Sequence, residues 1–179
     1  MKLLAFAASS SRQSINKQLV TYAASLLPDV DTEILDINDY EMPLFSVDRE
    51  AEIGHPEAAH RFLKKIAEAD ALLISFAEHN GSYTAAWKNL YDWCSRVETK
   101  VYQGKPVVML ATSPGGRGGM GVLGTATNSA PHFGAELKGS LSVPSFNDNF
   151  DSSSGQLTNP ELRAKLEATV AALTAEASA

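Results

Sequence analysis

A short segment near the start of the sequence gathers hydroxyl, amide and guanidinium side chains. Residues 9–16 read Ser-Ser-Ser-Arg-Gln-Ser-Ile-Asn and run directly into a stretch whose apolar residues recur at helical spacing. The first turn of a helix leaves backbone N–H groups free and carries the positive end of the helix dipole, so it favours an anion. The segment predicts a phosphate site; the alternative interpretation is a serine that merely caps the helix within a solvated loop.

Two more clusters follow apolar runs further along the chain. Residues 78–82 read Glu-His-Asn-Gly-Ser, and residues 113–119 read Ser-Pro-Gly-Gly-Arg-Gly-Gly. Residues 116–121 also fit the dinucleotide motif G-x-G-x-x-G, and Glu136 stands twenty residues after its first glycine. That match follows the fourth expected strand instead of the first, so we interpret it as chance. The sequence contains no G-x-x-x-x-G-K-[ST] loop, which excludes a nucleotide triphosphatase of that type.

The remaining histidines and the cysteine show no metal-ligand spacing. His55, His60 and His132 belong to neither an H-E-x-x-H motif nor a paired Cys/His pattern, so we expect no metal. Cys94 falls on the apolar side of a helical pattern, which favours a packed thiol over a nucleophile. A chain with one cysteine forms no internal disulfide, and the expected location is the reducing cytoplasm.

Composition restricts the class of protein. The chain has 179 residues, of which 44% are hydrophobic and 20% charged, as expected for one globular domain spanning residues 1–179. The formal net charge of −6 opposes binding to nucleic acid or to an anionic membrane surface. No apolar run approaches the roughly 20 residues that cross a bilayer, so no membrane partner is expected.

Apolar runs and helical spacings alternate five times along the chain. Short continuous apolar runs predict buried strands, and apolar residues recurring every three or four positions predict amphipathic helices. The expected strands are Leu3–Ala8, Thr32–Ile37, Ala71–Ala77, Pro106–Ala111 and Leu137–Val143. The expected helices cover residues 15–27, 57–68, 87–97, 121–132 and 160–173.

The segments between these elements carry further signals. Residues 38–56 are polar and interrupted by prolines, and we interpret them as a long surface connection. Residues 151–155 form a polar tail after the fifth strand. Thr158 and Glu161 suggest a capping box for the last helix, with Pro160 in its first turn.

The alternation predicts an α/β fold with a parallel sheet covered by helices on both faces, because each strand must cross over to reach a parallel neighbour. Five strands favour a three-layer, doubly wound, flavodoxin-like arrangement with strand order 2-1-3-4-5. Ligands then bind where the winding reverses, at the carboxyl ends of the first and third strands.

Three loops together resemble the NAD(P)H-dependent FMN reductase family, which includes flavin, quinone, azo-dye and chromate reductases. The resemblance is carried by the spacing of Ser9, Ser14 and Asn16, by residues 78–82 with the helix containing 88–93, and by residues 113–119. It covers nearly the whole chain and implies a non-covalent FMN cofactor, with NADPH or NADH as electron donor. Arg12, Ala77 and His79 depart from the usual family pattern.

The resemblance also implies which residues contact the cofactor. The residues after the first strand would hold the phosphate, residues 78–82 would follow the ring edge, and residues 113–118 would border the ring and ribityl chain. The assigned residues are Ser9, Ser11, Arg12, Ser14, Ile15, Asn16, Glu78, His79, Asn80, Gly81, Ser82, Ser113, Gly115, Gly116, Arg117 and Gly118. Arg117 could engage the 2′-phosphate of NADPH, with a solvated arginine as the alternative.

The function implied is transfer of hydride from NAD(P)H through FMN to a quinone, free flavin, azo compound or chromate, with no obligatory acid or base. One alternative is a flavodoxin-like electron carrier that binds FMN without oxidising NAD(P)H. Another is a regulator that binds a different phosphate ligand. The family resemblance further suggests a homodimer or homotetramer, with contacts from the aromatic helix at residues 87–93 and from residues 38–56.

Overall fold

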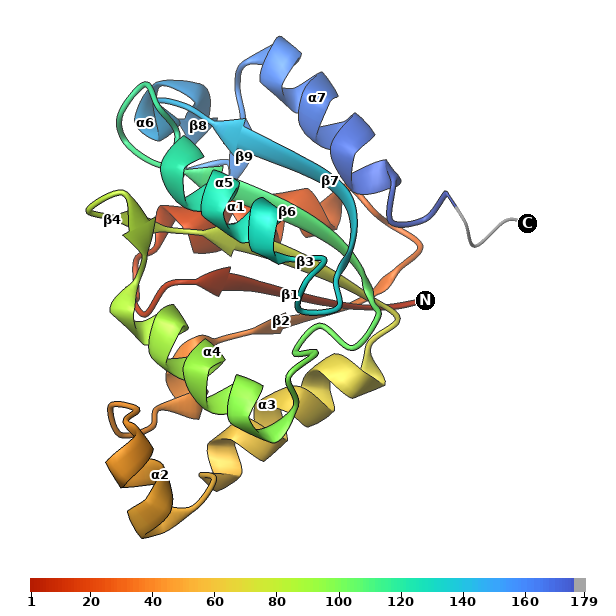
Figure 1. The fold of residues 1–179 in the computed structure, drawn as a ribbon. Coiled ribbons are helices and arrows are strands. Elements are labelled where there is room, and N and C mark those ends of the chain that lie inside the picture. Colours follow the sequence, from red (N-terminus) through yellow and green to blue (C-terminus); the bar gives the residue numbers. More distant parts are fainter. Residues whose placement is uncertain (176–179) are drawn as a thin grey trace.

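The computed structural model describes residues 1–175 and has three layers, with a parallel sheet between two layers of helices (Figure 1). The five strands are β1 (Lys2–Ala8), β2 (Asp31–Leu35), β3 (Ala71–Phe76), β6 (Pro106–Thr112) and β7 (Glu136–Val143). Their order is β2-β1-β3-β6-β7 and every pairing is parallel, so the predicted order 2-1-3-4-5 is confirmed. The carboxyl ends of the strands therefore share one edge, with the winding reversed between β1 and β3.

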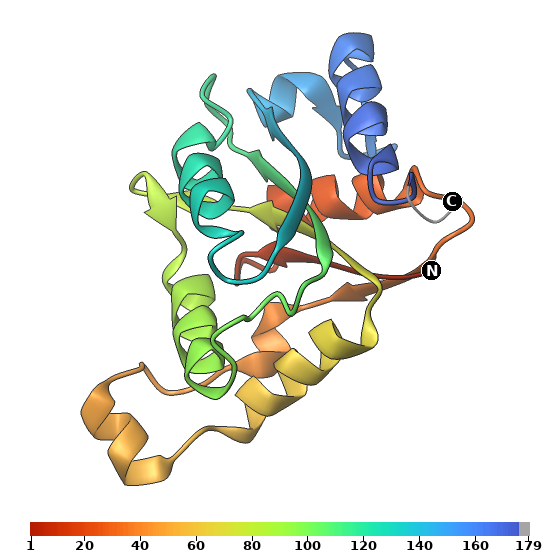
Figure 2. The same ribbon diagram turned by 45° about the vertical axis from the view of Figure 1, so that its right-hand side comes forward.

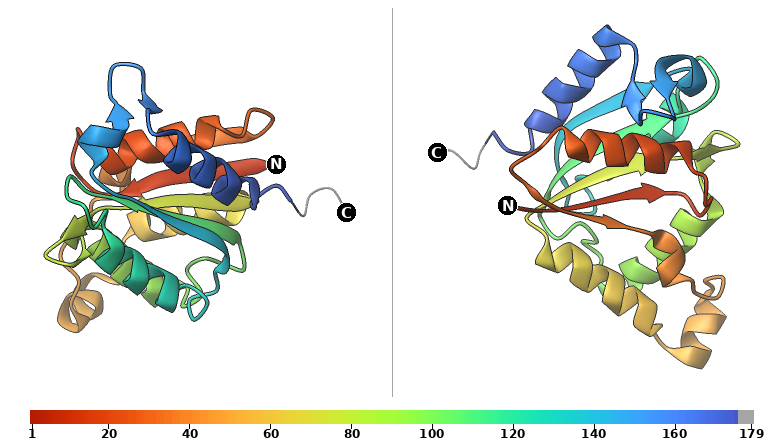
Figure 3. Two further views of the ribbon diagram at one scale, coloured as in Figure 1. Left: turned by 90° about the horizontal axis from the view of Figure 1, so that it is seen from above. Right: turned by 180° about the vertical axis from the view of Figure 1, so that it is seen from behind.

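Helices cover both faces of the sheet. The five long helices are α1 (Ile15–Ser25), α3 (Glu57–Glu68), α4 (Ala85–Val97), α5 (Met120–Ser129) and α7 (Pro160–Ala171). Figures 2 and 3 show α1 and α7 together on one face and α3, α4 and α5 on the other, which confirms the three-layer prediction. Within residues 1–175, no helix combines the length and apolar character needed to cross a membrane.

The central strands contribute side chains to two apolar layers. In β1, Leu4 and Phe6 pack toward α3 and α4, whereas Leu3 and Ala5 pack toward α1 and α7. None of these four side chains is more than 1% exposed. A strand buried on both faces has no position for a polar residue, which explains the continuous apolar run at the start of the sequence.

The tryptophans of α4 lie inside the core. The ring centroid of Trp87 lies 5.6 Å from that of Phe6 and 6.2 Å from that of Phe62. Trp87 and Trp93 are 1% and 0% exposed. These two side chains are therefore unavailable for the subunit contact expected of residues 87–93. Phe6 and Phe62 pack against Trp87, whereas Trp93 packs against Phe45 and donates a hydrogen bond to the Pro43 carbonyl.

The polar stretch 38–56 is more regular than expected. This region contains the short 3-10 helix η1 (Ile37–Tyr40), which begins one residue before it, and the helix α2 (Val47–Ile53). The second strand ends at Leu35, so its predicted extension to Ile37 is wrong. Ser46 caps α2 by accepting a hydrogen bond from a backbone N–H of its first turn. Because α2 buries none of its residues, it has no apolar stripe from which the sequence could have revealed it.

A small hairpin follows β3 at the carboxyl edge. Its strands are β4 (Glu78–His79) and β5 (Ser82–Tyr83). The turn residues Asn80 and Gly81 have positive φ angles of 51° and 76°, as both central residues of a type I′ turn require. An Asn-Gly pair between two short strands is a strong hairpin signal, so the segment predicted as a loop is a hairpin instead.

A second hairpin replaces the expected polar tail. After the short helix α6 (Phe146–Asn149), the chain forms β8 (Phe150–Asp151) and β9 (Gln156–Leu157), and residues 151–155 form the turn. Asn159, not Thr158, then caps α7 by accepting a hydrogen bond from the Glu161 N–H at 3.0 Å. The predicted capping box is therefore wrong, because Pro160 occupies the first helical position and leaves the cap to the residue before it.

Candidate functional site

Loops from three strands meet at the carboxyl edge, beside the point where the winding reverses. They enclose a cavity of about 270 Å³. One wall follows β1, one follows β3 and one follows β6, so residues far apart in the sequence share a single space. The lining residues are Ser9, Ser11, Gln13, Ser14, Ile15, Asn16, Ala77, Glu78, His79, Thr112, Ser113 and Pro114.

The β1 side of the cavity is a helix N-terminus. Ser14 is the N-cap of α1, and its Oγ accepts a hydrogen bond from the Lys17 N–H at 3.3 Å. Ser9 Oγ accepts one from the Ser11 N–H, also at 3.3 Å. The N–H groups of Ile15 and Asn16 have no acceptor within the helix, whereas those of Lys17 and Gln18 donate to the Ser14 carbonyl. Together with the helix dipole and the serine hydroxyl groups, the N–H groups of Ile15 and Asn16 can stabilise an anion.

Asn16 ties the start of α1 to the ends of two other strands. Its Oδ1 accepts hydrogen bonds from the Thr112 N–H at 3.0 Å and the Ser75 hydroxyl at 2.8 Å, and its Nδ2 donates to the Thr112 carbonyl at 3.2 Å. The residue is 2% exposed. This positioning role was missed from the sequence, because the two partners lie 59 and 96 positions further along the chain.

Two more side chains brace the first loop. Thr84 Oγ1 donates a hydrogen bond to the Ala8 carbonyl at 3.0 Å and also caps α4. Asn38 Nδ2 donates to the Ser10 carbonyl at 3.2 Å. The backbone on both sides of Ser9 is therefore held by residues outside the loop.

The two cations of this region differ in their partners. Lys17 Nζ lies 2.7 Å from Asp36 Oδ2. The hydrogen bond from Lys17 lowers the pKa of Asp36 below its ordinary value of 3.8, against a smaller opposing effect of burial. Arg12 makes no hydrogen bond or ion pair with any residue in the part of the chain that the structure describes. Its exposed guanidinium is available to a ligand.

Glu78 connects the loop after β3 to helix α5. Its Oε2 accepts a hydrogen bond from the Val122 N–H at 2.7 Å, in the first turn of α5. A Cβ on Gly121 would lie 2.6 Å from that oxygen and 3.3 Å from the Gly81 carbonyl. The carboxylate thus stabilises the positive end of α5, and the glycine at position 121 leaves it room.

The glycines of the loop after β6 have two different environments. A Cβ on Gly118, where φ is +57°, would meet Ser142 Oγ and lie 2.8 Å from the Pro144 nitrogen. Gly118 therefore packs against the end of β7 and its following residue. Gly115 and Gly116 would place a Cβ in open space, with no atom within 4 Å. Another molecule can approach the backbone at these two positions.

The structure brings about half of the predicted cofactor residues to the cavity. Those that line it are Ser9, Ser11, Ser14, Ile15, Asn16, Glu78, His79 and Ser113. Those that do not line it are Arg12, Asn80, Gly81, Ser82, Gly115, Gly116, Arg117 and Gly118. For both groups, contact with a cofactor stays a prediction. Asn80 and Gly81 form the hairpin turn, and Gly118 is directed toward β7.

Four residues of the cavity were missed from the sequence. Gln13, Ala77, Thr112 and Pro114 each stand next to a predicted residue in the chain. Each lies within or directly beside one of the three segments, so treating every segment as a continuous wall would have included them.

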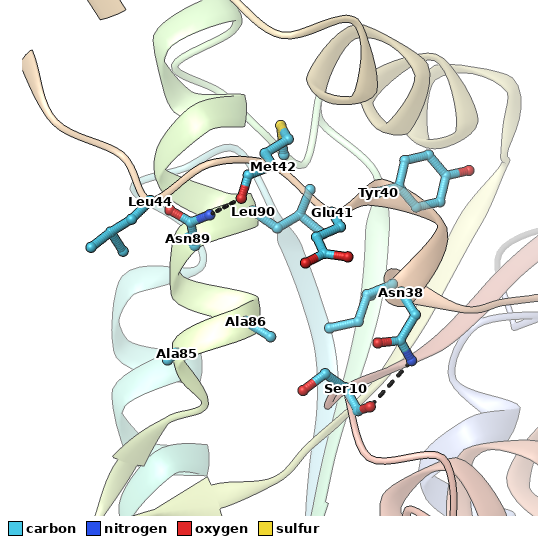
Figure 4. Close-up of a pocket in the computed structure, with 11 residues that line it drawn as sticks. Ser10, Asn38, Tyr40, Glu41, Met42, Leu44, Ala85, Ala86, Asn89 and Leu90 are labelled. Atoms are coloured by element: carbon cyan, nitrogen blue, oxygen red, sulfur yellow. Dashed lines mark hydrogen bonds between the residues drawn. The ribbon is translucent and has the colours of Figure 1, made fainter. Parts of the chain in front are cut away.

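A second cavity, of about 380 Å³, lies on the other side of the first loop (Figure 4). Ser10 lines it, together with residues of η1, the following segment and the start of α4. Figure 4 shows the Glu41 carboxylate directed toward the space between Ser10 and α4. A carboxylate in that position repels an anion. The carboxylate of the smaller cavity, that of Glu78, is instead bonded to the Val122 N–H, so the smaller cavity is the better candidate for a phosphate group.

Other reactive groups lie away from the site. Cys94 is 0% exposed, and burial raises the pKa of its thiol to about 12. The thiol lies 3.9 Å from the Ala59 carbonyl, so the predicted packed cysteine is confirmed. Within residues 1–175, no three His, Cys, Asp or Glu side chains are grouped to hold a metal ion.

Comparison with known proteins adds to this geometry. A family model described as NADPH-dependent FMN reductase matches residues 1–148. The chain is 39% identical over 128 residues to a 2-hydroxy-1,4-benzoquinone reductase from a Burkholderia species, covering 70% of this chain and 64% of that protein. It is 35% identical over 116 residues to an NAD(P)H-dependent FMN reductase from Pseudomonas aeruginosa, covering 64% and 61%. The chain thus spans less than two-thirds of these relatives' length.

Solved structures show the same fold. A flavoenzyme NAD(P)H:(acceptor) oxidoreductase from Paracoccus denitrificans superposes with a TM-score of 0.75 at 25% identity, covering 96% of this chain and 94% of that one. A flavodoxin variant from Pseudomonas aeruginosa superposes with a TM-score of 0.58 at 16% identity, covering 97% and 99%. The predicted flavodoxin-like α/β fold is confirmed.

Proposed function

The chain belongs to the NADPH-dependent FMN reductase family, and from this premise we propose that it is an oxidoreductase. It holds FMN non-covalently and passes hydride from NADPH or NADH to a small-molecule acceptor. The cavity that joins the N-terminus of α1 to the loops after β3 and β6 supports this proposal most directly. Ligands of open parallel sheets bind at such a point, and this one offers an anion site beside further lining loops.

The β1 side suits the phosphate of FMN. Ser9, Ser11 and Ser14 supply hydroxyl groups at a helix N-terminus, and Arg12 stands in the same turn with a free guanidinium. Hydrogen bonds to a charged phosphate are about twice as strong as those between neutral groups. We assign Asn16 a different part, in which its side chain holds the turn in place through Thr112 and Ser75.

The remaining walls suit the ring. The backbone of residues 77–79 and of Ser113 can bind its polar atoms. Residues 80–82 and 115–118 follow these segments along the chain. When bound, FMN supplies the redox chemistry by taking up hydride and giving it to the acceptor. The chain binds and orients the ring and leaves it accessible, so no side chain is required as an acid or base.

Relatives named quinone reductase support quinones as one acceptor class. Free flavins, azo compounds and chromate belong to the same proposal. Arg117 is exposed on the loop that borders the cavity. Its planar guanidinium suits the 2′-phosphate of NADPH, which would favour NADPH over NADH as donor.

Absorbance spectroscopy of the purified protein, supplied with FMN, tests the proposal. We expect a flavin spectrum that bleaches with NADPH under anaerobic conditions and returns when a quinone is added. Ser14→Ala should weaken FMN binding by about tenfold or more, because it removes a hydrogen bond to a charged group. The matched control is Ser95→Ala, whose hydroxyl bonds only to the Asp92 carbonyl in its own helix. Failure of the wild-type chain to take up FMN would contradict the proposal.

The same experiment separates the alternatives. An electron carrier would show the flavin spectrum, yet it would not oxidise NADPH in the presence of quinone without a partner protein. A regulator with another phosphate ligand would take up no FMN at all. Rapid oxidation of NADPH by the purified chain with quinone distinguishes the reductase from both.

We further propose a homodimer or homotetramer. Leu44 and Val47 are 80% and 71% exposed, and both lie in residues 38–56, the remaining candidate contact surface. Large apolar side chains grouped at a surface are typical of protein contacts. A monomer in sedimentation would contradict this part. The buried, unpaired Cys94 also suits a cytoplasmic location, where thiols stay reduced.

A further inference from the structure

We call residues 9–16 the phosphate turn and the 270 Å³ cavity proposed for FMN the cofactor cavity. A groove runs along α1 and meets this cavity at the phosphate turn. Its volume is about 570 Å³, larger than either cavity at the carboxyl edge. One wall is α1, and the other is the hairpin turn between β8 and β9. The proposed reductase site leaves most of this groove without a role.

The groove begins at the phosphate turn. Gln13 and Ser14 line both the groove and the cofactor cavity, so the two spaces adjoin there. From Ser14 the groove follows one stripe of α1 through Thr21 to Ser25. At 1.5 Å per helical residue this stripe is about 16 Å long, enough for an extended nucleoside monophosphate.

The chemistry of the lining changes along the groove. Arg12 places an unpaired guanidinium at the end that adjoins the phosphate turn, beside the ion pair of Lys17 with Asp36. Further along, the largely buried side chains of Tyr22 and Phe150, 8% and 5% exposed, line the groove with rings whose centroids lie 6.0 Å apart at an interplanar angle of 81°. A ligand that fits is anionic at one end and ring-shaped at the other. A uniformly acidic ligand would require cations along the full length.

The hairpin wall is held in place without a ligand. Ser152 Oγ donates a hydrogen bond to Gln18 Oε1 at 2.9 Å, which joins the turn to α1. Asp151 turns its carboxylate into its own hairpin, where Oδ1 accepts hydrogen bonds from the N–H and hydroxyl of Ser153 at 2.9 and 2.6 Å. The groove therefore has a fixed wall whose carboxylate is already bonded within the turn.

From this order of a free guanidinium followed by aromatic side chains, we propose that the groove binds the adenosine 5′-phosphate half of a dinucleotide. The other half enters the cofactor cavity, as the flavin of FAD, or lies against FMN bound there, as the nicotinamide of NADPH. The inference rests on the proposed function. Two molecules carry this half. In FAD it is joined directly to the phosphate of flavin mononucleotide, and in NADPH or NADH it is joined to the nicotinamide nucleotide.

Flavin binding to the apoprotein tests the FAD arm. Thr21→Trp fills the middle of the groove from an exposed position two helical turns away from the phosphate turn. We expect the wild type to bind FAD at least as tightly as FMN in fluorescence titrations. The variant should weaken FAD about tenfold while changing FMN by less than about twofold. Ser25→Trp, at the far end, gives a second obstruction, and Ala168→Trp on the exposed face of α7 is the control.

Steady-state kinetics of the FMN-loaded protein tests the donor arm. If the groove holds the adenylate half of NADPH, Thr21→Trp should raise the KM for NADPH about tenfold. The KM for reduced nicotinamide mononucleotide, which lacks that half, should stay constant. A selective effect in either arm supports the proposal. Normal FMN binding with no selective effect in either arm overturns it, whereas absence of FMN binding overturns the proposed function as well.

Discussion

The two loops that border the candidate cofactor cavity, those after β1 and after β6, are held by different means. The loop after β1 is held by side chains from outside it or at its end. Asn16 bonds to two strand ends, Thr84 bonds to the Ala8 carbonyl, and Asn38 bonds to the Ser10 carbonyl. Each of these bonds can be removed by one substitution that leaves the backbone unchanged.

The loop after β6 is held mostly by backbone hydrogen bonds, with a side-chain bond from Ser142 Oγ to the Gly118 carbonyl at 2.9 Å. The Ser145 N–H donates to the Gly115 carbonyl at 3.0 Å, and the Phe146 N–H donates to the Ser113 carbonyl at 3.1 Å. Its close approach to the residues after β7 also depends on Gly118 having no side chain. Such a loop is sensitive to an added atom instead of a removed one.

This difference determines which substitutions destabilise each loop. A loop held by buried side chains loses stability when a polar partner is deleted, because the groups left behind stay unsatisfied. A loop held by backbone bonds tolerates most substitutions and fails where a glycine permits a left-handed conformation or close packing. Four substitutions test this contrast.

The largest effect is expected from Gly118→Ala. The new Cβ would meet Ser142 Oγ and lie 2.8 Å from the Pro144 nitrogen, at a φ of +57°. Overpacking and the left-handed backbone together should lower the free energy of unfolding by about 3 kcal/mol, measured by urea denaturation. Gly116→Ala is the matched control in the same loop, and it should change stability by less than about 0.5 kcal/mol. Equal effects at the two glycines would refute the account of this loop.

The next largest effect is expected from Asn16→Ala. It leaves the Thr112 N–H and carbonyl and the Ser75 hydroxyl without their partner in a buried site, at a cost of about 2 kcal/mol in the free energy of unfolding. Asn128→Ala, on the exposed side of α5, should be nearly neutral. If Asn16→Ala weakens FMN binding and leaves urea denaturation unchanged, Asn16 contacts the phosphate directly, as the family resemblance implies.

A smaller effect is expected at the connection between the loops. Glu78→Ala removes the acceptor of the Val122 N–H and the charge at the start of α5, which should cost about 1 kcal/mol of unfolding free energy. Glu78→Gln keeps an acceptor oxygen and should lose less than half as much. Hydrogen exchange of the Val122 amide reports the local change. Similar protection in the two variants would show that the carboxylate does not hold α5.

The smallest effect concerns the ion pair beside the first loop. Because Lys17 lowers the pKa of Asp36 in the folded state, the pair stabilises the fold above the ordinary pKa of 3.8, and this contribution is lost as pH falls through the lowered value. The two side chains are 40% and 33% exposed, so solvent screening limits the contribution to about 0.5 kcal/mol. Denaturation of Lys17→Met should show this deficit at pH 6 and not at pH 2. A deficit that persists at pH 2 would have another cause.

Much of the fold could be read from the sequence. Helix α3 occupies the predicted residues 57–68, and its apolar positions Ala59, Phe62, Leu63 and Ile66 are buried as expected. Strands buried on both faces can be recognised in the sequence as continuous apolar runs. The helix α2 could not be read in this way, because it touches no core. The hairpin at residues 78–83 could have been read from its Asn-Gly turn.

In the site, too, features set by neighbouring residues could be predicted, whereas contacts between distant residues could not. The turn at residues 9–16 was visible because a serine-rich strand-to-helix junction is a local pattern, and the strand order placed it beside the loops after β3 and β6. The bond from Glu78 to Val122 spans 44 positions, that from Asn16 to Thr112 spans 96, and that from Ser152 to Gln18 spans 134.

By itself the sequence determined the alternation of strands and helices, the parallel sheet and the phosphate turn, since each depends on the spacing of nearby residues. Only the tertiary structure shows that Asn16 holds that turn in place, that Gly118 has no room for a side chain, and where the groove along α1 lies. Those features arise when backbone groups from distant segments must be satisfied or closely packed at one place, and no local pattern specifies which residues will meet.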